Sequence, residues 1–198
     1  LPDILRLSHS NNGTTRSIAA SILGSVGDSR PEVVHRLNQL ATERYSDSRR
    51  RAIQSLGQLG TGAKSATPTL VDIAANTSGT QEGYDAIWAL IQINNSSPEV
   101  VSTLKAIHGK RGPSEQKRFA AVALVSLGEP AENFIRDLHY LLENDSAGAR
   151  KFASIAATQM LTVDPEHQGA KALIAREEQN AKFNEAMKIE AQRRAESR

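Results

Sequence analysis

Apolar side chains recur at helical spacing along this chain, and the pattern repeats roughly every 34 residues. Its core is a base, an Ala three residues later and a Leu four residues after that, as in Arg16, Ala19 and Leu23. Apolar residues at positions i, i+3, i+4 and i+7 lie on one side of a helix. In this register the pattern predicts five helices, at residues 15–26, 48–59, 81–93, 114–127 and 147–161.

The segments between these helices carry the signals of a turn followed by a second helix. Each turn contains a residue that tolerates positive φ and so favours the end of a helix. These residues are Gly27, Gly60, Asn94 and Gly128. A proline then marks the start of the next helix, where its missing N–H would be unpaired anyway. These prolines are Pro31, Pro68, Pro98, Pro130 and Pro165.

The period between copies is nearly constant. The equivalent positions Leu23, Leu56, Leu90, Leu124 and Ala157 follow one another at almost equal steps. A fixed period of this length is typical of stacked helical repeats, which bury one continuous core and offer an extended surface. After Pro165 the chain continues as a predicted long helix, dense in charges of both signs.

The clearest copies run from Arg16 to Gly24, R-S-I-A-A-S-I-L-G, and from Arg49 to Gly57, R-R-R-A-I-Q-S-L-G. They resemble HEAT-like repeats, including the short type first described in phycobilisome lyase subunits, whose consensus is near V-R-x-x-A-A-x-A-L-G. The third copy departs from this consensus with Gly83 in place of the base. The resemblance implies the fold, but such repeats serve scaffolds, adaptors, nucleic-acid binders and a few enzymes.

The sequence therefore predicts an all-α protein, a right-handed α-α superhelix of the HEAT-like solenoid type with about five helical hairpins. We expect the solenoid at residues 1–174, as a half repeat at 1–12 and repeats at 13–44, 45–78, 79–111, 112–144 and 145–174, and a charged C-terminal helix or tail at 175–198. In this frame residues 2–7 lack their first helix, which would leave an apolar face open. We therefore expect a fragment of a longer protein, whose remainder covers the N-terminal edge.

Composition narrows the classes of partner and chemistry. The net charge of +2 is too small to indicate a nucleic-acid partner by itself, although the isoelectric point is near 9.0. The chain has no Cys, which excludes disulfides, thiolate nucleophiles and zinc–cysteine sites. No stretch approaches the roughly 20 apolar residues that a membrane span needs. We therefore expect a soluble protein, with the cytoplasm favoured as its compartment.

Three surfaces are candidates for binding. We expect the second helices to line a concave face, with partner contacts at His35, Arg36, Gln39, Asp72, Arg136 and Tyr140. The bases that begin the first helices form a ladder of Arg16, Arg49, Lys117 and Arg150. This ladder either follows a phosphate backbone or an acidic peptide, or it pairs with acids of the preceding loops or neighbouring repeats. The third surface is an outward apolar row of Trp88, Val122 and Ile155. It is a protein-binding patch, the wide apolar side of helices packed between neighbours, or a surface that the C-terminal helix covers through Phe183 and Met187.

No pattern in the chain is typical of catalysis. No two of the five His residues are three or four positions apart, and there is no Gly-rich phosphate loop or nucleophile motif. We expect no metal site, no cofactor and no enzymatic activity. The sequence favours a non-catalytic scaffold or adaptor that binds another protein. The alternatives are a nucleic-acid-binding helical-repeat protein and an accessory or lyase-like enzyme subunit.

Overall fold

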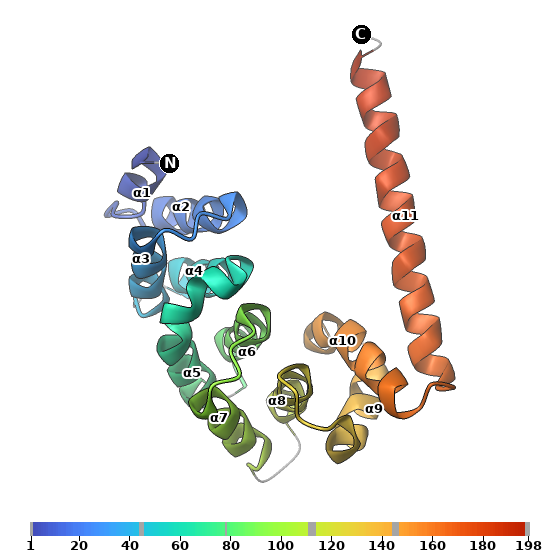
Figure 1. Ribbon diagram of the computed structural model, residues 1–198. Coiled ribbons are helices and arrows are strands. Elements are labelled where there is room, and N and C mark those ends of the chain that lie inside the picture. Colours follow the sequence, from blue (N-terminus) through green and yellow to red (C-terminus); the bar gives the residue numbers. More distant parts are fainter. Residues whose placement is uncertain (1, 44–45, 78, 111–113, 144–146, 197–198) are drawn as a thin grey trace. The chain divides into compact units, whose positions relative to one another are not determined.

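The computed structural model describes residues 2–43, 46–77, 79–110, 114–143 and 147–196, and every regular element in these ranges is a helix (Figure 1). The side chains of residues 147–151, and most of those after residue 179, lie outside the description. The predicted all-α class is confirmed for these residues. None of the described helices has both the length and the apolar composition needed to cross a membrane.

The α-helices are α1 (Pro2–Leu7), α2 (Gly13–Val26), α3 (Pro31–Ala41), α4 (Ser46–Gln58), α5 (Thr67–Asn76), α6 (Gln81–Ile93), α7 (Pro98–His108), α8 (Glu115–Ser126), α9 (Ile135–Glu143), α10 (Ala147–Val163) and α11 (Gln168–Glu196). Two 3₁₀ segments, η1 (Gly60–Ala66) and η2 (Ala131–Phe134), lead into α5 and α9. The predicted turn signals act as expected, because Gly27 and Asn94 end α2 and α6 with φ of 72° and 52°.

Each odd-numbered helix from α1 to α9 packs against the even-numbered helix that follows it. The closely packed pairs are α1 with α2, α3 with α4, α5 with α6, α7 with α8, and α9 with α10. About five hairpins are therefore present, but the predicted frame is shifted by one helix. Because a helix has a short link on each side, the length of the links does not decide which neighbour it packs against. The segment Pro2–Leu7, expected to lack its first helix, is the partner of α2.

Contacts divide the chain into two compact units, residues 1–130 and residues 131–198. Within the first unit, α2, α4, α6 and α8 pack directly on one another, whereas neighbouring odd-numbered helices touch little (Figure 1). Because the outside of a bend is longer than the inside, the tightly packed even-numbered row lies on the inside. The expectation that the second helices α3, α5 and α7 line a concave face is therefore wrong for this unit.

Small residues let the even-numbered helices approach one another. A Cβ added at Gly24 of α2 would lie 2.5 Å from the side chain of Ser55 of α4. One added at Gly57 of α4 would lie 3.2 Å from the Cβ of Ala89 of α6. Beneath these contacts the Ala and Leu residues of the repeated pattern form the core. They are Ala19, Leu23, Ala52, Leu56, Ala86, Leu90, Ala120 and Leu124, all of which are buried.

The N-terminal edge of this row exposes large apolar side chains of α2. Ile18, Ile22 and Val26 are 56%, 36% and 54% exposed. By the repeat spacing, Ile22 occupies the position that Ser55 and Ala89 hold at the contacts between even-numbered helices. That the remainder of a longer protein covers this edge stays a prediction.

Candidate functional site

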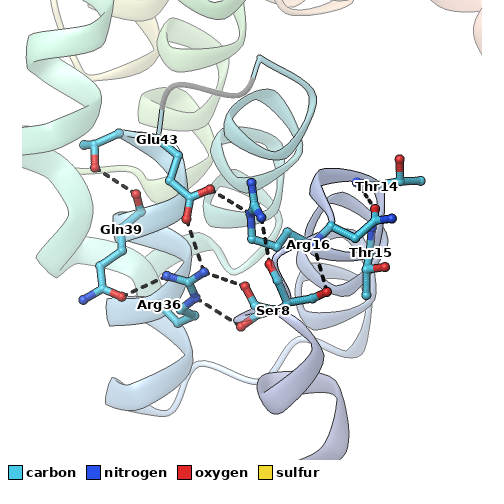
Figure 2. Close-up of polar contacts among 10 residues, drawn as sticks. Ser8, Thr14, Thr15, Arg16, Arg36, Gln39 and Glu43 are labelled. Carbon is cyan, nitrogen blue, oxygen red and sulfur yellow. Dashed lines mark hydrogen bonds and ion pairs between the residues drawn. The ribbon is translucent and has the colours of Figure 1, made fainter.

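Arg16, the first base of the predicted ladder, is buried and ion-paired (Figure 2). Its Nε donates to Glu43 (2.9 Å) and its Nη1 donates to the Ser10 carbonyl (2.7 Å). Arg36 of α3 is also buried, and it donates to the same Glu43 carboxylate (3.3 Å) and to the carbonyl and hydroxyl of Ser8. The prediction that Arg36 contacts a partner is therefore wrong, because both guanidinium groups tie the first two hairpins together.

Arg49, the second base of the ladder, forms an ion pair with the neighbouring repeat. Its Nη2 donates to the Glu82 carboxylate of α6 (3.0 Å). Burial alone would raise the pKa of Glu82, but the hydrogen bond from Arg49, a backbone N–H and the charges of Arg49 and Arg50 together hold that pKa below its ordinary value. Pairing with an acid of a neighbouring repeat is one of the two roles that the sequence allows for the ladder, and Arg49 has this role.

This pairing predicts a pH-dependent loss of stability. A carboxylate with a lowered pKa in the folded state stabilises the fold above its unfolded pKa, and this contribution is lost as the pH falls through the folded pKa. We expect Glu82→Gln to lower the urea midpoint at pH 7 and to have a much smaller effect near pH 3. Glu32→Gln, at a half-exposed pair with Arg30, should change the midpoint little at pH 7. A Glu82→Gln effect of equal size at both pH values would contradict the prediction.

The other two bases of the predicted ladder are Lys117 and Arg150. Lys117, on α8, is half-buried. Arg150 lies on α10, but its side chain is outside the described residues.

In the third copy, a buried glutamine takes the space that a base would need at Gly83. Gln116 of α8 donates from Nε2 to the Ala74 carbonyl (2.7 Å) and accepts at Oε1 from the Gly79 N–H (3.2 Å). A Cβ at Gly83 would lie 3.2 Å from Gln116 Nε2 and closer still to the carbonyl oxygen of Thr77. The missing base is therefore replaced by a polar contact from the next repeat.

The remaining predicted concave contacts lie on odd-numbered helices. His35 and Gln39 of α3 and Asp72 of α5 are exposed, and they belong to the outer row of the first unit. In the second unit, Arg136 of α9 is exposed and Tyr140 is half-buried. A hollow of about 500 Å³ beside α3 is lined by Pro31, Glu32, Val34, His35, Asn38 and Ser65. His35, Gln39 and Asp72 therefore do not line the inside of the bend of the first unit.

The predicted apolar row is only partly accessible. Trp88 of α6 and Ile155 of α10 are half-buried, whereas Val122 of α8 is fully buried. Val122 therefore does not belong to an exposed patch. Every residue of α8 from Phe119 to Val125 is buried, so this helix is packed over most of its circumference.

The inside of the bend carries a regular set of side chains, which we call the even-helix face. Three residues spaced by four on each helix lie on it: Ser17, Ser21 and Ser25 of α2, Arg50, Gln54 and Gln58 of α4, and Tyr84, Trp88 and Gln92 of α6. None of the nine is buried, whereas most of the residues between them are. Residues four apart lie above one another on a helix, so each set forms one line along the exposed side.

Contacts between neighbouring even-numbered helices fix several of these side chains. Gln54 donates to the carboxylate of Asp85 (2.8 Å), which is 1% exposed, and Arg50 lies 3.8 Å from the same oxygen. Tyr84 packs edge-on against Phe119, with ring centroids 5.0 Å apart. Burial, and then the charge of Glu115, raise the pKa of Tyr84 above its ordinary value.

Glutamines lie over the glycines of the neighbouring helix. A Cβ at Gly24 would be 2.7 Å from Gln58 Oε1, and a Cβ at Gly57 would be 2.5 Å from Gln92 Oε1. The two contacts are equivalent by the repeat spacing. The even-helix face therefore combines repeated amide groups with one Trp, one Tyr and an Arg whose side chain is 44% exposed.

Sequence reasoning placed Trp88 on an outward row but missed the rest of this face. The signal was present as polar residues spaced by four on the side opposite the Ala and Leu stripe, as in Arg50, Gln54 and Gln58. This pattern indicates a binding surface only if these helices lie on the inside of the bend, which the spacing alone does not show.

Two histidines meet in the second unit. His139 Nδ1 and His167 Nε2 are 3.4 Å apart, and His167 Nδ1 accepts from the Ala170 N–H at the start of α11 (3.1 Å). Among the described residues, no three His, Asp or Glu side chains gather as metal ligands would.

Comparisons with known proteins agree with this architecture. Residues 2–91, which span the three hairpins from α1 to α6, match the family model of HEAT repeats. No curated protein matches the chain. Among solved structures, the complex of CpcE and CpcF of phycocyanin lyase from Nostoc sp. PCC7120 contains a similar chain, with a TM-score of 0.60, 19% identity, and coverage of 88% of this chain and 69% of that one.

A second similar structure is an engineered protein, with a TM-score of 0.51, 17% identity, and coverage of 79% of this chain and 77% of that one. At such identities the similarity establishes the fold alone. Residues 2–91 match HEAT repeats, and the similar solved structures confirm the predicted HEAT-like helical-repeat fold of the chain.

Proposed function

We propose that this chain is a non-catalytic scaffold that binds another protein through the even-helix face around Trp88. The observation that carries the proposal is the gathering of Trp88, Tyr84 and Arg50 on adjacent helices. Trp, Tyr and Arg are the residue types most enriched among side chains that dominate protein–protein binding. Trp88 is half-buried, so it is already held in place and loses little side-chain freedom when a partner covers it.

The charges of the ladder support a protein partner over a nucleic acid. Arg16 and Arg49 are engaged by Glu43 and Glu82, so they contribute little net positive charge to a phosphate backbone. The similar chain from the phycocyanin lyase belongs to a complex of CpcE and CpcF, that is, to an assembly with another protein. A lyase-like accessory role is the remaining alternative, and it rests on fold similarity alone.

Affinity capture from a cell lysate tests the proposal. We expect Trp88→Ala to lose proteins that the unchanged chain retains, because truncating a central aromatic anchor costs at least about 2 kcal/mol of binding free energy. His35→Ala, at an exposed position on α3 outside the bend, should retain them. Circular dichroism of both variants controls for folding. The proposal fails if His35→Ala loses the captured proteins and Trp88→Ala keeps them, or if nuclease treatment of the lysate abolishes the capture.

A further inference from the structure

The even-helix face also has a spacing and a charge that suit one kind of polypeptide. We propose that it binds a polyproline II segment that crosses α6 and α4 and carries an acidic residue three positions from a proline. This inference rests on the proposed function and deepens it by naming the class of partner.

The spacing of the helices favours this conformation. Helices in close contact have axes about 8–10 Å apart, and α2, α4 and α6 approach closely at Gly24 and Gly57. A polyproline II helix advances about 9.3 Å per turn of three residues. Every third residue of such a segment therefore meets the next even-numbered helix in the same way. A β-strand repeats every two residues, or about 6.7 Å, and falls out of register.

The side chains of the face suit the groups that such a segment presents. Polyproline II chains have no internal hydrogen bonds, so their carbonyl oxygens are open to donors. Gln58 and Gln92 are exposed, are equivalent by the repeat spacing and carry amide N–H donors. Trp88 and Tyr84 supply the aromatic surface on which proline rings pack in known recognition of this conformation.

Two Arg side chains, Arg50 of the even-helix face and Arg51 beside it, specify the acidic residue. Arg50 and Arg51 of α4 are exposed, and Arg50 lies 3.8 Å from the buried Asp85, longer than a close ion pair. Arg51 has a long hydrogen bond of 3.4 Å to Gln54. A carboxylate one turn away from the proline at Trp88 would reach α4 at Gln54, the repeat equivalent of Trp88, beside the guanidinium groups of Arg50 and Arg51.

Intrinsic fluorescence tests the inference directly, because Trp88 is the one Trp of the chain. The probe is a peptide of four Pro-Pro-Glu triplets. The controls are a flexible peptide of four Gly-Ser-Glu triplets, which has the same charge, and one of four Pro-Pro-Lys triplets. We expect the first peptide to shift the Trp88 emission to the blue and to bind at least about tenfold more tightly than either control.

Two charge reversals separate the site from the rest of the surface. Arg51→Glu, at an exposed position, should weaken binding of the Pro-Pro-Glu peptide about tenfold or more without affecting the fold. Lys64→Glu, at an exposed position on η1, should leave the affinity unchanged. Equal effects of the two reversals would overturn the inference.

The remaining outcomes also decide between the two proposals. Equal affinity for Gly-Ser-Glu would reduce the interaction to charge alone and overturn the polyproline II inference. No binding of any peptide, together with protein capture that still depends on Trp88, would leave the scaffold function standing and remove this inference. Stronger binding of single-stranded DNA than of any peptide would overturn both.

Discussion

Replacing Gly83 by Arg should destabilise the protein by about 3 kcal/mol, although Arg is the residue that the repeat pattern leads one to expect there. The structure gives the reason. A Cβ at Gly83 would overlap the carbonyl oxygen of Thr77 and come within 3.2 Å of Gln116 Nε2. The Thr77 carbonyl accepts the N–H and the hydroxyl of Thr80, so it cannot move without disturbing the turn before α6.

Urea unfolding of three variants checks this expectation. Gly83→Ala isolates the Cβ and should lose about 1–2 kcal/mol, because the overlap outweighs the helix propensity gained from Ala. Gly13→Ala, in the first turn of α2, is the matched control. Its Cβ would meet only Arg16 Nη2 at 3.8 Å, so its stability should be unchanged or slightly higher. Wild-type stability of Gly83→Arg would show that Gln116 is not the residue that takes the space of the base.

Replacing Glu43 by Ala should lower the free energy of unfolding by about 2–3 kcal/mol. Glu43 is the common acceptor of Arg16 and Arg36, whose side chains are 7% and 11% exposed. Removing one partner from a buried ion pair costs about 3–5 kcal/mol, because the remaining charge stays buried without compensation. Glu43 is itself 27% exposed, so water can partly replace it, and we expect a loss below that range.

Asp3→Ala is the control for this second prediction. Asp3 and Arg6 are also ion-paired (3.3 Å), but their side chains are 84% and 80% exposed. Such a pair contributes at most about 1 kcal/mol. Thermal and urea unfolding of both variants should therefore differ clearly. If Glu43→Ala costs no more than Asp3→Ala, the buried cluster in Figure 2 does not hold the first two hairpins together.

The local signals in the sequence predicted the helices well. The predicted helix at 81–93 coincides with α6, because Thr80 accepts from the Gly83 N–H at one end and Asn94 adopts positive φ at the other. Caps, turns and the proline at the start of α7 act over a few residues, so they can be read from neighbouring positions alone.

The pairing of helices and the placement of the site could not be read in the same way. Both links of α3 are short, so nothing in them tells whether it packs on α2 or α4. That choice decides which row lies inside the bend, and with it whether Trp88 or His35 lies on the inner face. The role of Gln116 could not be read from the sequence either. Gln116 lies in one repeat but fills the space of the base that is missing at Gly83 in the preceding repeat.

The unequal packing of the two rows has a mechanical consequence. In residues 1–130 the even-numbered helices are joined by glycine and serine contacts, whereas the odd-numbered helices touch one another little. Spreading or closing the outer row therefore disturbs few interactions, while stretching the inner row separates the close contacts at Gly24 and Gly57. We therefore expect the unit to bend by changes in the spacing of the odd-numbered helices, while the spacing of the even-numbered helices stays fixed. Its curvature can then change while the spacing of the side chains on the even-helix face stays constant.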